Sequence, residues 1–500
     1  MTFTKVTSDL IKRTSDSPGW VERSEKVAIT DYINVKDFGA KGDMVVDDTG
    51  AIKAAVAAAA SYSGRAAAVY FPGGFYNVSS TIELPSWVQL VGSGIETTQI
   101  RCTNPDAGHI IFLPNGTQYN GIRGMTVRYA TVPASGGIGI GIRSYHPYFQ
   151  QIKVIDCYIG IKIYENDYAV TSNATGVFVE QFQINDCSYV GLMVGNSNGG
   201  FCNDITFRDG LMLTGNPAYF RLGGIRVIGR VESLTLTNID MIGGRLPYTS
   251  DAGSTEGLRF STFTGIFFDS GAARCEFGRM RHCQFTNCWI SGGRVNGTEG
   301  AHFLDVQNTT FTGLRVYNCG GSGLVFDNCS YVNVVESSFG LNNSNSLSDG
   351  PRWHMQFAGN CSHFTVQNCT SNEASGTIAA GVRVESGSTH YTVEGNHFGQ
   401  VTVPVSEGNS GAQGRFVANN AFYTTYATGG GILGSGATSV TVSHGLAVVP
   451  QLKQVRVQQN GASVSPLYVK SVDGTTITVA TQQSNSDAAL FTWEVDATRY

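Results

Sequence analysis

Short runs of alternating apolar and polar residues recur from residue 66 to about residue 426, and each run ends at Gly, Asn, Asp or Ser. One recurring unit has apolar residues at alternate positions followed by Asn or Asp; its copies are IKVIDC (152–157), FQINDC (182–187), ITFRDG (205–210) and FTVQNC (364–369). A second unit places Gly before the alternating pair; its copies are GIKI (160–163), GLMV (191–194), GIRV (224–227), GIFF (265–268), GLVF (323–326) and GVRV (381–384). Alternation with a period of two predicts β-strands that each bury one side.

The spacing of these units predicts the fold. Neighbouring copies lie about 22 to 40 residues apart, which suits one solenoid coil with loops of variable size. A tight turn between two sheet faces needs a residue in the left-handed conformation, which Asn, Asp and Gly tolerate. This turn chemistry accounts for Asp156, Asp186, Asp209, Asn238 and Asn368. We therefore expect an all-β chain whose body is a right-handed, single-stranded parallel β-helix.

The segment 34–60 predicts a helix that caps the solenoid. Residues 47–49 (Asp-Asp-Thr) offer N-cap side chains and negative charge at the positive end of the helix. The apolar face of the predicted helix comprises Ile52, Ala55, Val56 and Ala59. Gly64 is a candidate terminator. A helix in this place would cover the open first coil, which would otherwise expose unpaired strand edges.

The C-terminal part of the chain has a different pattern. Gly429 to Gly431 predict a linker, and alternating strands with hairpin turns such as Asp473-Gly474 follow it. The expected domains are an N-terminal arm (1–30), a capping region with the helix (31–65), the β-helix (66–426) and a small β-sandwich (432–500).

Composition limits the partners. The net charge is −5 and no run of Lys or Arg appears, so the chain is not expected to bind a nucleic-acid backbone. No apolar stretch approaches the roughly 18 residues of a membrane span, so no membrane insertion is expected. The N-terminal residues lack the apolar core of a secretory signal. We expect synthesis in the cytoplasm and release by lysis or particle assembly.

The cysteines predict buried thiols and not disulfides. Their number, 11, is odd, and no pair has the CxxC spacing of a zinc site. Seven of them follow Asn or Asp: Cys157, Cys187, Cys288, Cys319, Cys329, Cys361 and Cys369. A small thiol that points inward at a repeating position explains this pattern.

Four segments near the N-terminus are characteristic: NVKDFGAKGD (34–43), DDTGAI (47–52), VYFPGGFYNV (69–78) and VQLVGSG (88–94). They resemble the N-terminal signature of the pectate-lyase-like superfamily, as found in bacteriophage tailspikes and polysaccharide depolymerases. Met44 stands where that pattern usually has Gly, and Val46 where it usually has Thr. The segment from His444 to Pro450 is similar to small C-terminal domains of phage tail proteins.

This resemblance implies a homotrimer of β-helices on a virion that cleaves or modifies a bacterial surface polysaccharide such as capsule, exopolysaccharide or O-antigen. It also implies contact with other phage tail proteins through the N-terminus, with residues 1–30 as a candidate virion-docking segment. Residues 432–500 would then serve trimerisation or glycan binding. No cofactor is expected. The resemblance does not carry catalytic residues across, so these must be sought in the pattern itself.

One set of carboxylates follows the second repeating unit. Asp269 follows GIFF and Asp327 follows GLVF, while Asp305 and Glu385 occupy the same place after HFL and GVRV. If coils stack without insertion, Asp269 lies one rung from Asp305 and two from Asp327, roughly 5 Å and 10 Å at about 4.8 Å per rung. Retaining glycosidases hold their carboxyl groups about 5–5.5 Å apart and inverting ones about 6.5–9.5 Å. The alternatives are Asx turns or oxygens that hold a divalent cation.

A second candidate site lies in IRSYHPYF (142–149). Arg143 would neutralise a uronic carboxylate, and Tyr145, His146 or Tyr148 would remove the C5 proton in a polysaccharide lyase. Packing or sugar stacking is the alternative explanation of such aromatic–histidine clusters.

Trp289 and Trp353 are candidate stacking platforms for sugar rings, or they are buried in a trimer seam. The insertion 245–264 interrupts the coil rhythm before Asp269, and a long loop on a rigid solenoid commonly walls a groove.

Three functions fit these features. The first is an endo-acting glycoside hydrolase on a phage particle, with Asp269, Asp305 and Asp327 as catalytic residues. The second is a polysaccharide lyase on the same scaffold. The third is a receptor-binding tail protein that holds polysaccharide without cutting it.

Overall fold

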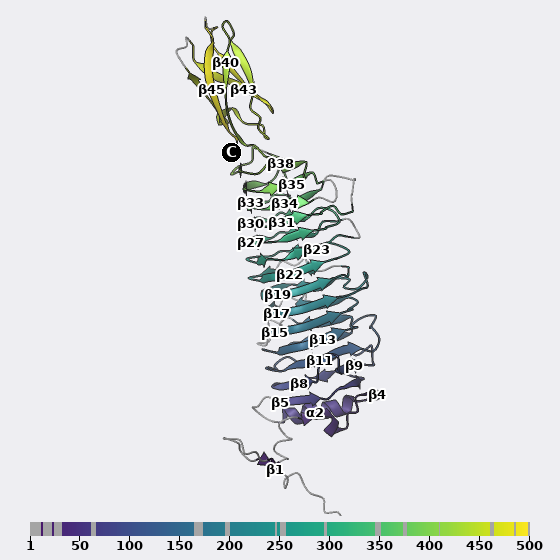
Figure 1. Cartoon of the computed structure of the whole chain (residues 1–500). Coiled ribbons are helices and arrows are strands. Elements are labelled where there is room, and N and C mark those ends of the chain that lie inside the picture. The colour runs from purple at the N-terminus through teal and green to yellow at the C-terminus, as the bar shows by residue number, and fades with distance from the viewer. Residues whose placement is uncertain are drawn as a thin grey trace, which may run out of the picture. The chain divides into compact units, whose positions relative to one another are not determined.

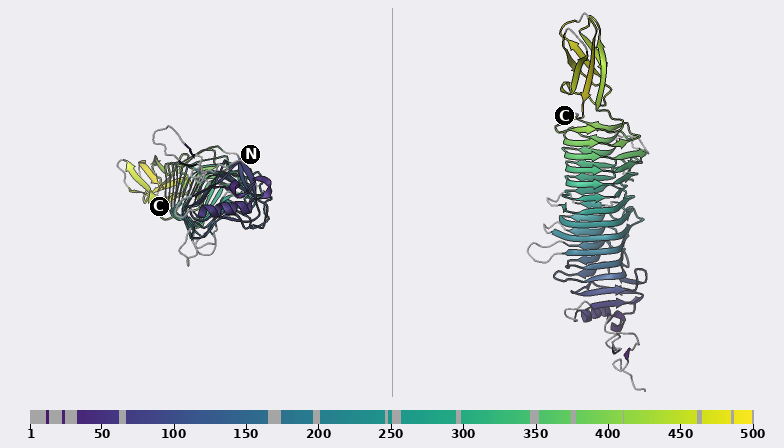
Figure 2. Two further views of the ribbon diagram at one scale, coloured as in Figure 1. Left: turned by 90° about the horizontal axis from the view of Figure 1, so that it is seen from below. Right: turned by 60° about the vertical axis from the view of Figure 1, so that its left-hand side comes forward.

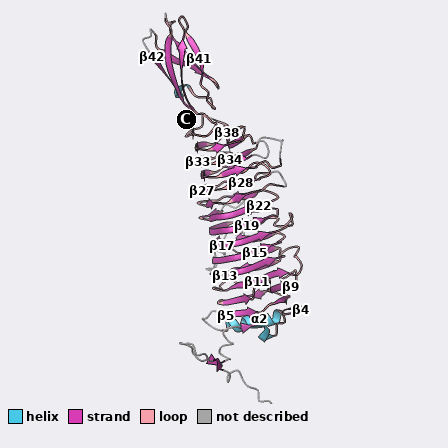
Figure 3. Ribbon diagram, in the orientation of Figure 1, coloured by secondary structure: helices cyan, strands magenta, loops and turns pink. Residues whose placement is uncertain are grey.

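The computed structural model describes most of the chain, which divides into two compact units, Met1–Thr262 and Phe263–Tyr500 (Figure 1). The described residues are 12–13, 23–24, 33–61, 67–164, 174–195, 201–245, 248–250, 257–294, 298–345, 352–373, 378–409, 411–460, 465–484 and 487–498. Strands dominate both units, as Figure 3 shows.

The first unit is a parallel β-solenoid built from two sheets. Sheet I consists of β7 (Ile82–Glu83), β10 (His109–Leu113), β12 (Ile138–Ile142), β14 (Ile159–Ile163), β16 (Val190–Gly195), β18 (Gly223–Ile228) and β20 (Tyr248–Ser250). Sheet II consists of β3 (Ile33–Asn34), β4 (Asp43–Asp47), β5 (Ala67–Phe71), β6 (Gly74–Val78), β8 (Val88–Gly92), β9 (Thr98–Cys102), β11 (Gly121–Tyr129), β13 (Tyr148–Ile155), β15 (Thr175–Asn185), β17 (Phe201–Leu213), β19 (Arg230–Ile242) and β21 (Leu258–Arg259). Each strand pairs in parallel with the strand one coil away, as β13 does with β11 and β15.

The long strands of sheet II each have a residue in the left-handed conformation at the same place in the register. We call this set the corner column: Gly124, Gln151, Gln181, Asp209 and Asn238, with φ of 65°, 51°, 52°, 55° and 51°. The strand registers place them opposite one another on β11, β13, β15, β17 and β19. The turn residues predicted outside this column, Asp156, Asp186 and Asn368, are also left-handed, with φ of 57°, 48° and 54°. The turn prediction is confirmed.

The second unit contains further parallel coils. Sheet III consists of β23 (Cys275–Gly278), β26 (Ala301–Leu304), β29 (Leu324–Asp327), β32 (Trp353–Ala358), β35 (Ala380–Val384) and β38 (Val403–Glu407). Sheet IV consists of β22 (Thr262–Asp269), β24 (Gln284–Thr286), β25 (Trp289–Ile290), β27 (Gln307–Thr312), β28 (Arg315–Tyr317), β30 (Ser330–Val335), β31 (Ser338–Gly340), β33 (Ser362–Gln367), β34 (Thr370–Glu373), β36 (Thr389–Glu394), β37 (His397–Phe398) and β39 (Phe416–Ala418).

Equivalent side chains stack along the interior of the coils. In the second unit, Phe277, Phe303, Phe326 and Phe357 form successive ring stacks at 4.7, 4.9 and 4.9 Å between centroids. These spacings match the separation of about 4.8 Å between neighbouring strands. All 11 cysteines are free and buried, as the sequence predicted.

The predicted cap is the helix α2 (Thr49–Ala60), which buries Ile52, Ala55, Val56 and Ala59. Figures 1 and 2 show it across the first strands of the first unit. The 3₁₀ helix η1 (Val35–Phe38) precedes it. Asp47 accepts a hydrogen bond from the Thr49 N–H, whereas Asp48 accepts from the N–H groups of Lys41 and Gly42. Gly64 lies outside the described residues, as does the predicted arm except for the antiparallel pair β1 (Lys12–Arg13) and β2 (Arg23–Ser24).

The C-terminal residues form two three-stranded antiparallel sheets. One contains β40 (Tyr426–Leu433), β45 (Ala489–Asp496) and β42 (Val455–Asn460), and the other contains β41 (Ser439–Ser443), β44 (Thr476–Thr481) and β43 (Leu467–Val472). The short 3₁₀ helix η2 (Leu452–Gln454) precedes β42. The turn at Asp473 joins β43 to β44, and its carboxylate accepts from the N–H groups of Thr475 and Thr476.

The prediction of a glycine linker is wrong. Gly429 to Gly431 lie in β40 and pair with β45. A Cβ atom at Gly429 would lie 2.4 Å from the Trp493 ring, and one at Gly431 would lie 2.4 Å from the Phe491 ring. The glycines are therefore strand residues that make room for two aromatic rings. No helix among the described residues is long and apolar enough to cross a membrane.

Candidate functional site

The predicted carboxylate column is wrong for Asp269. This residue ends β22, which pairs with β25 in sheet IV, whereas Asp327 ends β29 of sheet III. The sheet III strand nearest to Asp269 along the chain is CEFG (275–278), which pairs with β26. GIFF repeats the apolar pattern of GLVF, but alternation alone does not distinguish one sheet from another. The Asp269 carboxylate accepts a hydrogen bond from the Ser270 hydroxyl at 2.9 Å.

Asp305 is displaced from the column by one position. Leu304 pairs with Asp327, so Asp305 lies opposite Asn328, and both are left-handed with φ of 53°. Its carboxylate lies 3.6 Å from Arg279 Nε and 3.1 Å from Arg281 Nη2. Asp305 is thus a left-handed turn residue whose carboxylate is bound by two arginines.

Glu385 does occupy the column of Asp327. Asp327 pairs with Ala358, and Val384, which precedes Glu385, pairs with Phe357. The two carboxylates are therefore two strands apart, roughly 10 Å along the sheet. Glu385 accepts from Gln356 Nε2 at 3.2 Å.

The structure brings a histidine between Asp327 and a carboxylate that the sequence did not suggest. His302 on β26 has its Nδ1 3.4 Å from Glu299 Oε1 and its Nε2 3.8 Å from Asp327 Oδ2. Arg274 contacts Glu299 through Nη1 at 2.6 Å and Glu276 through Nε at 3.4 Å. We call Glu299, His302 and Asp327 the sheet III cluster. The signal for it was present in the HFLD segment, because His302 alternates with the buried Phe303.

The environment of His302 favours a neutral imidazole. Burial of the ring and the Arg274 guanidinium lower the pKa of His302, against the opposing effect of the Glu299, Asp327 and Glu276 carboxylates. Its side chain is 22% exposed, but Nε2 is buried and has no hydrogen-bond partner among the described residues. A neutral imidazole can accept a proton, and the two carboxylates at its sides can exchange protons with a bound molecule.

The two predicted aromatic platforms lie on different sheets. Trp353 begins β32 of sheet III, the sheet that carries Asp327. Trp289 lies in β25 of sheet IV and packs against Phe267 at 5.8 Å between ring centroids. Trp353 alone shares a sheet with the cluster.

Two of the candidate side chains in segment 142–149, Arg143 and His146, contact different neighbours. The Arg143 guanidinium lies over the Tyr164 ring at 4.6 Å, and Tyr145 forms backbone bridges to Gln118 and Thr175. His146 stacks instead on Tyr119, which stacks on Trp87; the centroid distances are 5.5 and 4.4 Å. Arg143 and His146 thus have different ring partners.

Tyr148 belongs to a separate cluster on sheet II. Its hydroxyl donates to Glu180, which also accepts from Gln150 Nε2 and Arg208 Nε, each at 3.0 Å. The hydrogen bonds from Tyr148 and Arg208 lower the pKa of Glu180. Burial and the Glu180 carboxylate raise the pKa of Tyr148. Glu180 is therefore an ionised carboxylate whose oxygens are already bonded.

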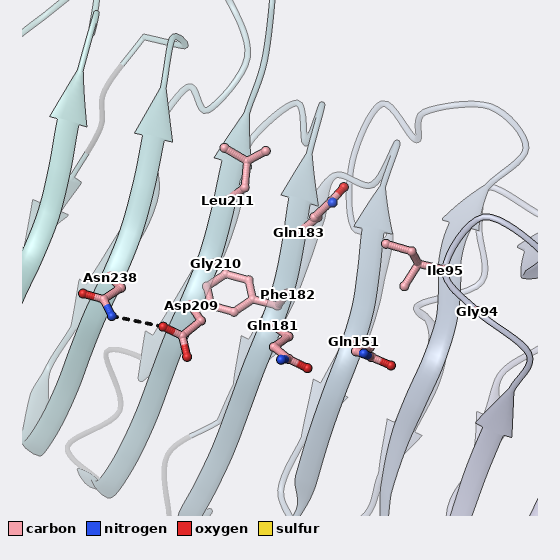
Figure 4. A pocket seen from close by; sticks show the side chains of 10 residues that line it. All are labelled: Gly94, Ile95, Gln151, Gln181, Phe182, Gln183, Asp209, Gly210, Leu211 and Asn238. Atoms are coloured by element: carbon pink, nitrogen blue, oxygen red, sulfur yellow. Dashed lines mark hydrogen bonds between the residues drawn. The ribbon is translucent and has the colours of Figure 1, made fainter.

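A groove lies beside this cluster, with a volume of about 750 Å³ (Figure 4). Its lining residues are Gly94, Ile95, Gln151, Gln181, Phe182, Gln183, Asp209, Gly210, Leu211 and Asn238. Four of them belong to the corner column, so the groove follows this column along sheet II. Within the described ranges, no group of three or more His, Cys, Asp or Glu side chains is placed to hold a metal ion.

Two family models match the chain. Residues 32–221 match the rhamnogalacturonase A/epimerase, pectate lyase-like family, and residues 253–446 match the right-handed β-helix region. Among characterised proteins, mannuronan C5-epimerase AlgE2 of Azotobacter vinelandii is 30% identical over 233 residues. That match covers 41% of this chain and 23% of the epimerase, so the chain spans about a quarter of that relative.

Solved structures share the fold at low identity. Tailspike protein 3 of bacteriophage CBA120 superposes with a TM-score of 0.61 at 15% identity, covering 83% of this chain and 66% of that one. The tailspike protein gp49 of Pseudomonas phage LKA1 has a TM-score of 0.54 at 12% identity, covering 93% of this chain and 99% of that one. Because identity is low, these likenesses concern the solenoid and not the site.

Proposed function

We propose that this right-handed β-helix protein, which matches a pectate lyase-like family model over residues 32–221, is a phage tailspike that depolymerises a bacterial surface polysaccharide as an endo-acting glycosidase. The observation that carries the proposal is the sheet III cluster, in which Glu299 and Asp327 lie on either side of His302. The tailspike likeness in fold and the epimerase relative support a polysaccharide as the substrate.

The spacing of the two carboxylates is compatible with inversion. The contacts of 3.4 and 3.8 Å on the two nitrogens of one imidazole ring put the nearest carboxylate oxygens at most on the order of 9 Å apart, below the upper limit of roughly 9.5 Å for inverting enzymes.

The neighbours of each carboxylate suggest its role. Glu299 is ion-paired to Arg274 and suits the base that takes a proton from the attacking water. Asp327 meets no arginine or lysine among the described residues, and its Oδ1 accepts from Asn328 at 2.8 Å. It suits the acid that protonates the leaving oxygen. His302 positions both groups, and Trp353 offers a stacking surface on the same sheet.

The test compares Glu299→Gln and Asp327→Asn with Asp269→Asn, a matched change on sheet IV, in the full-length protein. Capsulated bacteria are screened for clearing, and released oligosaccharides are assayed for new reducing ends and for the ultraviolet band of unsaturated sugars. We expect each cluster variant to lose at least 100-fold in rate, while Asp269→Asn keeps the parent rate. Full activity in both cluster variants would refute the assignment.

A lyase is the second candidate, because a neutral His302 beside Arg274 also fits removal of a proton next to a uronic carboxylate. The ultraviolet band separates the two reactions, since elimination creates a double bond and hydrolysis does not. A protein that only binds the polysaccharide would give neither product. Trimer formation, location in the virion and docking through the N-terminus remain parts of the tailspike proposal.

A further inference from the structure

The groove of the first unit contains two glutamines in a backbone conformation that glutamine rarely adopts. Gln151 and Gln181 have φ of 51° and 52°, whereas the same corner column holds Gly124 and Asn238, residue types that tolerate this conformation. Turn chemistry alone would favour Gly or Asn at every position. Another glutamine, Gln400, is also left-handed, with φ of 54°. Gln151 and Gln181 differ from it because they lie on adjacent strands and both line one groove.

The side-chain amides of these glutamines are available to a ligand. Both residues are exposed, and neither side chain hydrogen-bonds another of the described residues. They lie on adjacent strands, β13 and β15, in matching register. Their separation along the sheet is therefore about 4.8 Å, comparable to the advance of one sugar residue in an extended glycan. Figure 4 shows them side by side in the groove.

One wall of the groove is fixed in place. The loop that carries Gly94 and Ile95 is held to β11 by the Thr126 hydroxyl, which donates to the Ile95 carbonyl. Lys153 on β13 bonds Glu96 of the same loop at 2.9 Å. The Gly94 N–H donates to the Gly124 carbonyl at 2.8 Å. A wall bonded to two strands keeps the groove formed without a ligand, which lowers the entropy cost of binding.

The lining favours an uncharged, polyhydroxylated ligand. Amides donate and accept hydrogen bonds, as hydroxyl groups require, and Ile95 and Leu211 supply apolar surface for sugar C–H groups. Asp209 is the one ionisable residue of the lining. It accepts from Asn238 Nδ2 at 3.1 Å, and its Oδ2 lies 3.9 Å from Nε of Arg208, which is outside the lining. The carboxylate of a uronate would be repelled by the Asp209 carboxylate, because no side chain of the lining carries a positive charge.

We propose that this groove is a glycan-binding site for a neutral, extended stretch of polysaccharide, with the amides of Gln151 and Gln181 bonding hydroxyls of successive sugar residues. The inference rests on the proposed function only in taking a polysaccharide as the ligand, since it uses no residue of the sheet III cluster. It also defines the substrate class as a chain that contains a neutral segment.

The test measures binding of maltohexaose, cellohexaose, laminarihexaose and the acidic hexamannuronate by calorimetry. The full-length protein carries Asp327→Asn, so that no probe is consumed. We expect at least one neutral hexasaccharide to bind, and Gln151→Gly with Gln181→Gly to weaken its Kd about tenfold or more. Glycine is chosen because Gly124 already occupies the same column at φ 65°, so the fold is retained. The control is Gln284→Ala, at an exposed strand glutamine of the second unit.

Three results would overturn the proposal: no neutral probe binds at millimolar concentration, hexamannuronate binds more tightly than every neutral probe, or the double glycine variant keeps the parent Kd. The two proposals fail separately. Full depolymerisation by Glu299→Gln and Asp327→Asn would refute the cluster while leaving the binding result intact. Loss of activity in those variants with an unchanged Kd in the glycine variant would refute the groove alone.

Discussion

His302 Nε2 lies 3.8 Å from Asp327 Oδ2, across two adjacent strands of sheet III. Three aspartates were predicted to be catalytic, and of these Asp327 is the one that contacts this histidine. Because burial and Arg274 lower the pKa of this histidine, its neutral form is the one present at neutral pH. The activity should therefore depend on pH through His302.

The pH dependence has a defined direction. The rate should be constant near neutral pH and fall as the medium is acidified below about 6.5, where His302 begins to protonate at its lowered pKa. Arg274→Gln removes a cation that holds this pKa down, so the acid limb should move to higher pH. Rates measured from pH 4 to 8 for the parent and the variant decide this. An acid limb that stays in place would show that His302 does not control the rate.

Trp353→Ala should raise KM more than it lowers kcat, because a stacking surface contributes to substrate binding before and during the reaction. We expect an increase in KM of about fivefold, since stacking on an aromatic ring is worth about 1 kcal/mol. Trp289→Ala is the matched control on sheet IV. Equal effects of the two substitutions on KM would contradict a role for sheet III alone.

A buried ion pair should dominate the stability of the last coil. Arg415 and Glu407 have side chains that are 1% and 2% exposed, with Arg415 Nε 2.6 Å from Glu407 Oε1. The hydroxyls of Tyr391 and Tyr423 also donate to Glu407. Glu407→Gln should lower the free energy of unfolding by about 3–5 kcal/mol, because Arg415 would keep a buried charge without a partner.

The matched control for that pair is Glu232→Gln. Glu232 is paired with Arg230, and their side chains are 22% and 31% exposed, so the loss should be below about 1 kcal/mol. Denaturant titration of both variants provides the comparison. Similar losses in the two would show that burial does not set the strength of the Glu407 pair.

Acid should destabilise the second unit through His354. This residue is buried between Asn342 and Ser371, with contacts of 3.1 and 2.8 Å, and burial lowers its pKa to about 3. Between about pH 6.5 and 3 the unfolded chain binds a proton that the folded chain does not. The contribution of His354 to the free energy of unfolding is therefore complete above its pKa in the unfolded chain, about 6.5. It declines as the pH falls below that value, by up to about 1.4 kcal/mol per pH unit. His354→Gln should flatten this part of the curve; an unchanged slope would assign acid sensitivity to other groups.

Gly176→Ala should destabilise the first unit. Gly176 has φ of 64°, and a Cβ atom there would lie 2.1 Å from His146 Nδ1. The substitution therefore strains the backbone and displaces a ring that stacks on Tyr119. We expect a loss of about 1–3 kcal/mol, measured as a lower Tm. Gly116 has a comparable φ of 78°, but a Cβ atom there would have no other atom within 4 Å. The Gly116→Ala variant therefore measures the backbone strain without the clash with His146.

Local chemistry determined much of the fold. Alternation with a period of two predicted the strands, Asp and Asn predicted the left-handed turns, and the apolar face of Ile52, Ala55, Val56 and Ala59 predicted the helix α2. These features depend on residues close in the chain. The buried cysteines also followed from their fixed place after the turn residues.

The sites were decided by pairing between distant strands. A repeated apolar motif does not say to which sheet its strand belongs, so Asp269 was grouped with Asp327 although their strands lie in different sheets. A shift of one position likewise turned Asp305 toward Arg279 and Arg281. The sequence by itself thus determined that this is a solenoid with turns at Asn, Asp and Gly. Only the tertiary structure decided which side chains meet, because register and sheet assignment fix side-chain neighbours across coils more than 20 residues apart in the chain.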